Sequence, residues 1–339
     1  MFKISGISGA VLIMTTGINL HFLSQAKVNP SLHNSNILTN KTSVPQHPKE
    51  IEKSPNISTA KPPNRIEKSP NISAANTPTQ EEMEHFQEII ENAIAQQLYN
   101  KSMPDIIIAI ANQFLGTPYQ AGLLDKSQEE TLVVTLDKFD CVLFIETVLA
   151  MARGIAVQDY YYETFRDRIM DQRYQNGQLN GYCSRLHYFS SWIDDNEKRG
   201  TVENITVNLG GVPLNKQLNY MSTHRQSYPQ LVDNQVNYQC IREMEAKLNS
   251  LKINYIPTHQ ISRIYERLQP GDIIGVATDI PGLDVTHTGL VYRQTNGNIG
   301  LIHASPGRSV RVAGDLQQYV GNVKHAIGII VTRPVDSVF

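Results

Sequence analysis

The stretch FDCVLFIETVLAMARG, residues 139–154, limits the possible folds of this chain more than any other part of the sequence. Apolar residues recur at helical spacing from Val142 to Ala152 and also fill the adjoining face, which predicts a helix that is buried on most sides. Asp140 is placed to cap the start of this helix, and Gly154 is placed to end it. Because other elements must cover such a helix, we expect it at the centre of the folded domain.

Cys141 lies in the first turn of this predicted helix, beside backbone N–H groups without helical partners and at the positive end of the helix dipole. An unperturbed thiol has a pKa of about 8.5, and a helix N-terminus lowers it and favours the thiolate. Cys141 is therefore a candidate nucleophile. The alternative is a small buried apolar residue, which is the commoner role of a lone cysteine.

Residues 1–26 have a basic start, an apolar middle and the ending Ser24-Gln25-Ala26. This pattern predicts an export signal, and hence a location in the periplasm or cell envelope with no stable membrane span after the signal is removed. The alternative is an uncleaved anchor, because residues 4–23 are nearly long enough to cross a bilayer. The formal net charge of −2 does not indicate nucleic acid as a partner, and we expect none.

The chain has three cysteines, an odd number for an exported protein. One of them must stay outside any disulfide within a monomer, and Cys141 is the obvious candidate. Cys183 and Cys240 can either bond to each other or remain as two buried thiols. The sequence favours neither.

Residues 27–80 contain 8 of the 17 prolines and no aromatic residue, with seven Lys and Arg against three Glu. Such a segment cannot bury enough apolar surface to offset its conformational entropy, so we predict a disordered linker. The octapeptide IEKSPNIS occurs at residues 51–58 and again at 66–73, which we interpret as a duplicated spacer. The alternative is a basic tether that lies along anionic wall polymers or lipid.

The folded part is predicted to begin near residue 81. Thr79 and Glu82 have the spacing of a capping box before the amphipathic run EEMEHFQEIIENAIAQQL. A second helix is predicted over residues 104–114. A short extended run over residues 131–139 then leads into the Cys141 helix.

The pattern changes from helical to strand-like at Pro270. The section before it, residues 155–269, is mainly helical, with helices predicted over 161–174, 184–200 and 241–251 and a β-like run over 201–209. After Pro270, five short runs are separated by Gly, Asn and Pro, namely PGDIIGVAT, HTGLVYRQ, IGLIHAS, SVRVA and HAIGIIVTR. Helices followed by strands predict an α+β domain, in which the Cys141 helix packs on an antiparallel sheet of about five strands.

Two histidines lie at the ends of neighbouring predicted strands, His287 at the start of HTGLVYR and His303 near the end of IGLIHAS. Folding the hairpin about Gly297 places them roughly opposite each other. We expect both side chains on the sheet face that receives the Cys141 helix. There His287 can take the thiol proton, and His303 can hold the other ring nitrogen of His287.

A zinc site is the competing chemistry, because His287, His303, His325 and Asp284 are all suitable donors. No pair of these has the helical spacing of a metal motif such as HExxH, and no second cysteine lies near Cys141 in the sequence. We therefore expect neither a metal nor another cofactor.

Several motifs occur in the order found in NlpC-type papain-like cell-wall peptidases, namely Gly116-Thr117-Pro118-Tyr119, Asp140-Cys141, Pro270-Gly271-Asp272, His287-Thr288-Gly289 and Ile302-His303-Ala304. The stretches SRLHYFSSWIDDNEKRG, PGLDVTHTG and HASPGR resemble the N-acetylmuramoyl-L-alanine amidase-like branch of that superfamily. The resemblance spans about residues 85–335. It implies a papain-like domain over 81–339, with 155–269 as an insertion that walls the cleft. Where compact members continue Asp-Cys with Ser-Gly, this chain has Val142-Leu143.

The resemblance also implies roles for individual residues. Cys141 would be the nucleophile, His287 the general base and later the acid, and His303 the residue that orients His287.

Three further residues are candidates for substrate binding. Tyr119 would lie over the cleft and help to position the substrate or the oxyanion. Arg185 would bind an anionic group of the substrate, and Asp284, within PGLDVTHTG, is the third candidate.

The implied reaction is amide hydrolysis through an acyl-thioester. The branch resemblance favours the bond between the lactyl group of N-acetylmuramic acid and L-alanine, on soluble peptidoglycan fragments (muropeptides) with an anhydro sugar. The alternative bond is the γ-D-glutamyl bond to a diamino acid in wall peptides, and the same three side chains would serve either. A thiol acyltransferase or a non-catalytic wall-binding module is the alternative of another class.

Overall fold

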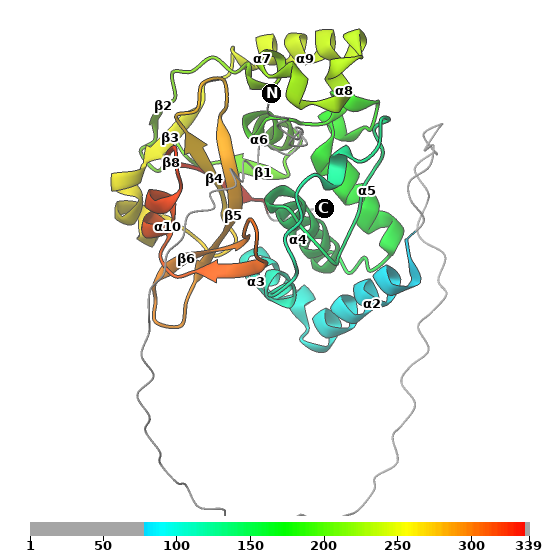
Figure 1. Cartoon of the computed structure of the whole chain (residues 1–339). Coiled ribbons are helices and arrows are strands. Elements are labelled where there is room, and N and C mark those ends of the chain that lie inside the picture. The colour runs from blue at the N-terminus through cyan, green and yellow to red at the C-terminus, as the bar shows by residue number, and fades with distance from the viewer. Residues whose placement is uncertain (1–77, 336–339) are drawn as a thin grey trace, which may run out of the picture. The chain divides into compact units, whose positions relative to one another are not determined.

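The computed structural model describes residues 78–335 (Figure 1). The predicted export signal and all but the end of the predicted linker lie outside these residues. The helices are α2 (Gln80–Ala95), α3 (Met103–Gln113), α4 (Cys141–Ala156), α5 (Tyr162–Arg173), α6 (Phe189–Lys198), α7 (Tyr220–Thr223), α8 (Pro229–Val232), α9 (Gln235–Leu248) and α10 (Leu316–Asn322). Within residues 78–335, no helix is long and apolar enough to cross a membrane.

The strands of the described residues form one antiparallel sheet. They are β1 (Val202–Asn204), β2 (Val212–Pro213), β3 (Asn254–Pro257), β4 (Ile273–Thr278), β5 (Val285–Arg293), β6 (Ile299–Ala304), β7 (Val310–Ala313) and β8 (Ala326–Pro334). Their order is β2-β3-β8-β4-β5-β6-β7, and β1 pairs with β8. The five predicted strands are β4 to β8, so the α+β class and the antiparallel sheet are confirmed.

The sheet is wider than the predicted five strands. β1, β2 and β3 come from the section that reads as mainly helical, and both β1 and β3 pair with the long strand β8. These added strands are two to four residues long. Strands of this length are too short to show alternation in the sequence, so only pairing with a neighbour reveals them.

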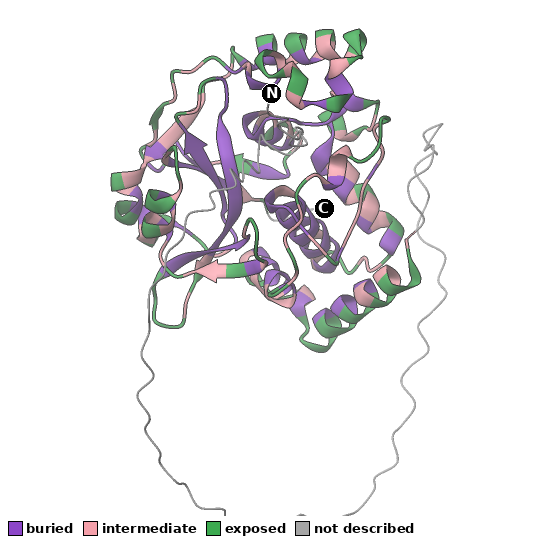
Figure 2. Ribbon diagram, in the orientation of Figure 1, coloured by how far each residue is buried: buried purple, intermediate pink, exposed green. Residues whose placement is uncertain are grey.

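Two cores lie on opposite faces of this sheet. Leu290 and Ile302 belong to the larger core, which they share with α4, whereas Val291 and Leu301 belong to a smaller core beneath α10 and the 3-10 turns of η6 (Thr258–Arg267). Successive side chains of a strand point to opposite faces, which explains the division. Figure 1 shows α10 on one side of the sheet and α4 and α5 on the other, and Figure 2 shows that α4 and the central strands are buried.

α4 begins at the predicted position because Asp140 caps it. The Asp140 carboxylate accepts hydrogen bonds from the backbone N–H groups of Val142 (3.0 Å) and Leu143 (2.8 Å). The helix packs against α3, α5, β5 and β6. Its apolar residues on several faces are buried by these neighbours, as the sequence pattern predicts.

The end of α4 differs from the prediction that Gly154 stops it. The helix continues through Gly154 to Ala156. A Cβ at Gly154 would lie 2.8 Å from the backbone oxygen of Asp159. The glycine therefore permits a close approach of the following loop rather than a helix stop.

The run over residues 131–139 leads into α4 without forming a regular strand, and within it only Phe139 makes a β-bridge, with Tyr119. One other local prediction is wrong in part, because the helix predicted over 184–200 begins only at Phe189, as α6. Before it, the turn η4 (Tyr182–Ser184) and an extended segment deliver the chain to the helix.

Cys183 and Cys240 form a disulfide, with their Cα atoms 6.2 Å apart. The bond joins η4 to α9 across 57 residues of chain. It decides between the two alternatives for these cysteines. Cys141 is the cysteine that stays outside a disulfide.

Candidate active site

His287 of β5 and His303 of β6 form a hydrogen-bonded pair. Nε2 of His287 lies 2.7 Å from Nδ1 of His303, and the two rings are at 89° with centroids 4.9 Å apart. Both side chains are buried, with 4% and 2% of their surface exposed. The structure therefore brings together the two histidines that the sequence singled out.

The hairpin predicts that the two histidines lie roughly opposite each other. In the structure they are diagonal neighbours. β5 and β6 pair Leu290 with Ile302, so the next step along each strand places Gly289 across from His303. A Cβ on Gly289 would lie 2.8 Å from the Cβ of His303, and its absence leaves room for the imidazole to lean toward His287. The predicted register is wrong by two residues. A shift of two residues keeps both side chains on the same face of the sheet, so the two histidines still meet.

The histidine pair lies on the α10 side of the sheet, and the prediction that it faces the body of α4 is wrong. Leu290 packs on the α4 side and lies three residues beyond His287, an odd spacing that puts the two on opposite faces. Tyr319 of α10 contacts both rings, with centroids 6.0 Å from His287 and 4.7 Å from His303. No motif marks Tyr319, because α10 has only seven residues and its contact with the sheet is made in three dimensions.

Cys141, at the tip of α4, lies beside β5. The backbone N–H of Thr288, the residue after His287, interacts with the thiol. Burial raises the pKa of Tyr319, and a thiolate at Cys141 raises it further. The first turn of α4 therefore lies against the strand that carries His287.

The thiol itself does not behave as the helix start predicts. Burial raises the pKa of Cys141 far above its ordinary value, and the carboxyl of Asp140 raises it further. The N–H groups of Thr288, Cys141 and Val142 act in the opposite direction, but they do not compensate for the lost hydration of a fully buried sulfur. The expectation of a favoured thiolate is wrong, and the resting site holds a neutral thiol.

Both histidines are also held neutral. Burial lowers the pKa of His287 well below its ordinary value, and His303 lowers it further. Burial lowers the pKa of His303 to about 4, with a contribution from Arg311 of β7. At neutral pH the hydrogen bond between the rings holds one proton, so the pair can accept another.

Tyr119 is held beside the start of α4 by its backbone. Its N–H donates to the carbonyl of Arg308 (3.0 Å), and it bridges Phe139, two residues before Cys141. The predicted neighbourhood of Tyr119 and the nucleophile helix is therefore present.

Arg185 belongs to a buried group of charges, here called the arginine cluster, which consists of Asp125, Glu130, Glu146, Arg173 and Arg185. Arg185 lies 3.0 Å from Asp125 and 3.7 Å from Glu130, and Arg173 lies 2.7 Å from Glu146. No side chain of the cluster is more than 6% exposed. Two carboxylates already neutralise Arg185, so the structure gives it a structural role in place of the predicted contact with an anionic substrate group.

Asp284 is likewise engaged within the protein. Its carboxylate accepts hydrogen bonds from the backbone N–H groups of Ser190 (2.7 Å) and Val285 (2.8 Å), and the residue is fully buried. Burial raises its pKa. Asp284 thus ties α6 to the start of β5 rather than facing a cleft, which corrects its predicted role in substrate binding.

Of the four donors proposed for a zinc site, only His287 and His303 are hydrogen-bonded to each other. His325 lies at the surface with its Nδ1 2.9 Å from Asp279. Between residues 78 and 335, no group of three or more His, Cys, Asp or Glu side chains has a geometry that could hold a metal ion.

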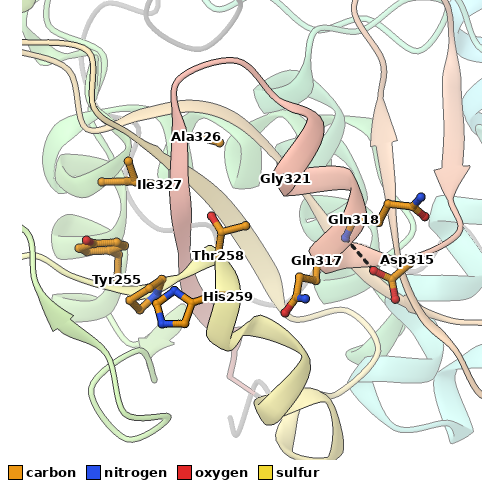
Figure 3. Close-up of a pocket in the computed structure, with 10 residues that line it drawn as sticks. Tyr255, Thr258, His259, Asp315, Gln317, Gln318, Gly321, Ala326 and Ile327 are labelled. Carbon is orange, nitrogen blue, oxygen red and sulfur yellow. Dashed lines mark hydrogen bonds between the residues drawn. The ribbon is translucent and has the colours of Figure 1, made fainter.

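An open groove of about 720 Å³ lies beside α10 (Figure 3). It is lined by Tyr255, Pro257, Thr258, His259, Asp315, Gln317, Gln318, Gly321, Ala326 and Ile327. Tyr319 contacts the histidines, whereas its neighbour Gln318 lines the groove. The groove is therefore separate from the candidate active site.

Comparisons with known proteins bear on the family and the fold of this chain. A model of the AmiA-like family, described as N-acetylmuramoyl-L-alanine amidase-like, matches residues 109–329. The chain is similar to the structure of an N-acetylmuramoyl-L-alanine amidase from Bacteroides uniformis, with 29% identity over 68% of this chain and 98% of that chain and a TM-score of 0.64. A putative xylanase from Bacteroides fragilis is 32% identical over 66% of this chain and 98% of that chain, with a TM-score of 0.58.

A fourth comparison extends the likeness in fold alone. The protein LPG0564 from Legionella pneumophila is 23% identical over 77% of this chain and 98% of its own, with a TM-score of 0.55. None of the curated proteins matches the chain. Because the family match covers more than half of its length, this protein belongs to the AmiA-like family of N-acetylmuramoyl-L-alanine amidase-like proteins.

Proposed function

We propose that this protein hydrolyses the amide between the lactyl group of N-acetylmuramic acid and L-alanine, on soluble peptidoglycan fragments that carry the anhydro sugar. Membership of the amidase-like family and the likeness to an amidase of this name support the bond. The observation that best supports the chemistry is the 2.7 Å hydrogen bond between His287 and His303. Thr288, the residue after His287, interacts through its backbone N–H with the Cys141 thiol. α4 packed on an antiparallel sheet further supports a papain-like core.

His287 acts in this proposal through Nδ1. Its Nε2 faces Nδ1 of His303, so a proton on Nε2 can donate to His303 and the lone pair on Nδ1 is left for the thiol proton. His303 holds His287 in this tautomer. When His287 becomes positively charged, the hydrogen bond to His303 becomes charge-assisted and strengthens.

The reaction begins when the proton of the Cys141 thiol moves to Nδ1 of His287 as the sulfur forms a bond to the carbonyl carbon. The backbone N–H of Cys141, together with Tyr119, stabilises the oxyanion. The imidazolium then protonates the nitrogen of L-alanine as the carbon–nitrogen bond breaks. Water, deprotonated by His287, hydrolyses the remaining thioester.

The electrostatics of the site favour coupling between proton transfer and attack. Burial raises the pKa of the Cys141 thiol and lowers the pKa of His287, so a standing thiolate–imidazolium pair is disfavoured. Each unit of pKa difference corresponds to about 1.4 kcal/mol. We therefore assign His287 the role of a general base that removes the proton as the sulfur attacks.

We also propose that the protein acts outside the cytoplasm. The basic and apolar pattern of residues 1–26 supports export. The disulfide between Cys183 and Cys240 supports it independently, because disulfides persist mainly in oxidising compartments.

The test is incubation of the purified protein with anhydro-muropeptides and with intact wall, followed by mass analysis of the products. Release of the sugar together with an intact L-alanyl peptide is the expected result. A released diamino-acid fragment would instead identify a γ-D-glutamyl endopeptidase. A mass gain on a peptide amine would identify acyl transfer, and unchanged substrates would identify a binding module.

Three variants assign the chemistry. We expect Cys141→Ser and His287→Gln to lower turnover by at least about 10³-fold while the fold is retained. His325→Gln is the matched control, because this surface histidine pairs with Asp279, and it should turn over substrate like the wild type. Wild-type turnover in Cys141→Ser would remove Cys141 from the mechanism.

A further inference from the structure

We propose that Arg311 of β7 binds a carboxylate of the substrate beside the histidine pair, which is the role that the sequence assigned to Arg185. The carboxylate that fits is the free α-carboxylate of the glutamate in the peptide stem. It is free because this glutamate is joined to the diamino acid through its γ-carboxyl. The inference deepens the proposed function and rests on it.

Arg311 lies directly across from His303 in the sheet. β6 and β7 are antiparallel, and their register pairs His303 with Arg311. Residues in directly opposite positions share a face of the sheet, with Cβ atoms about 4.5–5.5 Å apart. Val310, the residue before Arg311, is buried in the core on the α4 side, so alternation along β7 also places Arg311 on the α10 side. The arginine side chain therefore starts next to the histidine pair and on the same face.

The charge of Arg311 is available to a ligand. Arg311 is exposed, and within residues 78–335 its guanidinium makes no hydrogen bond and no ion pair. Arg185 differs in this respect, because Asp125 and Glu130 neutralise it in the core. Of these two arginines, Arg311 is the one that can neutralise an anionic group of the substrate.

The substrate can reach Arg311 from the edge of the sheet. β7 is the last strand in the sheet order, and the segment beside it covers only its start, where Val310 exchanges hydrogen bonds with Gly116 (2.9 Å) and Thr117 (2.8 Å). A charge on an edge strand also discourages pairing with other chains. That role would be served by a charge anywhere along β7 and does not require one across from His303.

The spacing along the substrate also fits. The glutamate α-carboxylate lies two residues along the peptide from the bond that is cut, which is about 7 Å in an extended chain. Arg311 is a long side chain that begins one strand away from His303. Tyr119, proposed to stabilise the oxyanion, donates its N–H to the carbonyl of Arg308, three residues before Arg311. The cut bond and the carboxylate can therefore be held by one end of the sheet.

The charge of Arg311 opposes the proposed reaction unless an anion neutralises it. Burial lowers the pKa of His303, and the charge of Arg311 lowers it further. A fixed cation at this place disfavours the positive charge that the histidine pair takes up with the thiol proton. A substrate carboxylate paired with Arg311 offsets this cation, so the binding of a substrate that carries the carboxylate also helps the base step.

The test compares two anhydro-muropeptides that differ only in the glutamate α-carboxylate, which is free in one and an amide in the other. Release of the sugar is followed by mass, and kcat and KM are measured for the wild type, Arg311→Met, Arg311→Lys and Arg242→Met. Arg242 is the matched control, because it is an exposed arginine of α9, a helix that packs on α7, α8 and η4.

We expect the wild type to prefer the carboxylate form by at least about tenfold in kcat/KM, because hydrogen bonds between charged partners are the strong ones. Arg311→Met should lose this preference, mainly through a higher KM for the carboxylate form, and should cleave the amide form at least as well as the wild type. Arg311→Lys should keep part of the preference, because it retains the charge without the planar fork. Arg242→Met should match the wild type with both substrates.

The outcomes separate this inference from the proposed function. If Arg311→Met cleaves the bond to L-alanine with the same preference as the wild type, the role of Arg311 is wrong and the proposed function stands. A lower Tm for Arg311→Met with an equal loss for both substrates would show that Arg311 only supports the fold, and would overturn the inference. If the wild type releases the sugar from neither substrate, the proposed function fails and the inference fails with it.

Discussion

Two buried polar clusters meet at α4, and they handle charge in opposite ways. The arginine cluster includes Glu146 of α4, and each of its arginines lies within 4.0 Å of a carboxylate. The histidine–thiol cluster consists of Cys141, His287, His303 and Tyr319. Here burial pushes every group toward its neutral form.

The difference shows which cluster supports the fold and which is suited to chemistry. In the arginine cluster, burial raises the pKa of Glu130 and Glu146, but Arg173 and Arg185 act against this rise and keep their own charge. Each charge there has an opposite charge as a fixed neighbour. In the histidine–thiol cluster, a charge can arise only when a proton moves between neighbours, as a general acid–base step requires. Strongly shifted pKa values without compensating charges are typical of functional sites.

The largest effect is expected from breaking the arginine cluster. Arg173→Met should lower the free energy of unfolding by about 3–5 kcal/mol, because it leaves Glu146 buried without its partner. Denaturant unfolding measures this change. Arg153→Met is the control, since Arg153 and Asp171 form a more exposed pair that contributes about 1 kcal/mol or less. Equal losses for both variants would show that burial does not decide the energetics.

A second prediction concerns Arg185, which the sequence assigns to the substrate. Arg185→Met should lower stability by about 3 kcal/mol, because Asp125 and Glu130 lose their counter-charge. KM for the muropeptide should change little. A strongly raised KM at unchanged stability would return Arg185 to the substrate site.

The histidine–thiol cluster should make the free energy of unfolding depend on pH. His303 titrates near its ordinary pKa of about 6.5 when unfolded and at about 4 when folded, so the unfolded state binds the proton first. The contribution of His303 to the stability of the folded state is complete above about pH 6.5. As the pH falls toward 4, this contribution is lost, and the free energy of unfolding falls by up to about 3 kcal/mol.

The comparison of wild type with His303→Gln isolates this term. Asp140, whose pKa burial raises to about 7, changes stability in the opposite sense, because its protonated form is favoured in the folded state and stability falls as pH rises. The variant should lose less stability than the wild type between pH 6.5 and 4. Parallel curves would contradict the assignment.

The smallest effect is expected at the boundary between the clusters. Asp140→Asn keeps a good helix cap but removes the charge that raises the pKa of the Cys141 thiol. The rate at which iodoacetamide alkylates Cys141 at a fixed pH should therefore rise by about tenfold or less, as followed by intact mass. A slower alkylation would show that the cap, rather than the charge, governs the thiol.

Local patterns in the sequence predicted the elements that form this site. The apolar spacing and Asp140 predicted α4 and its first residue, and alternation between turn residues predicted β4 to β8. The hairpin about Gly297 brought His287 and His303 together on one face. These features depend on residues close in sequence, and periodicity reports them well.

The rest of the site depends on neighbours distant in sequence. Tyr319, the pairing of Arg185 with two carboxylates and the burial of Asp284 follow from packing between separate segments. An arginine beside aromatic residues looks the same in sequence whether a substrate or a buried carboxylate neutralises it. The hairpin predicted from the sequence also has the wrong register, because Gly289 rather than His287 lies across from His303.

The sequence by itself determined the cysteine at the tip of a buried helix, the antiparallel strands and the histidine pair, because each is encoded by local spacing and turn chemistry. Only the tertiary structure decided which face of the sheet carries the histidines, which charges neutralise each other and whether the thiol is ionised. Desolvation depends on everything that packs around a group, so the protonation state of Cys141 is a property of the whole fold rather than of its helix.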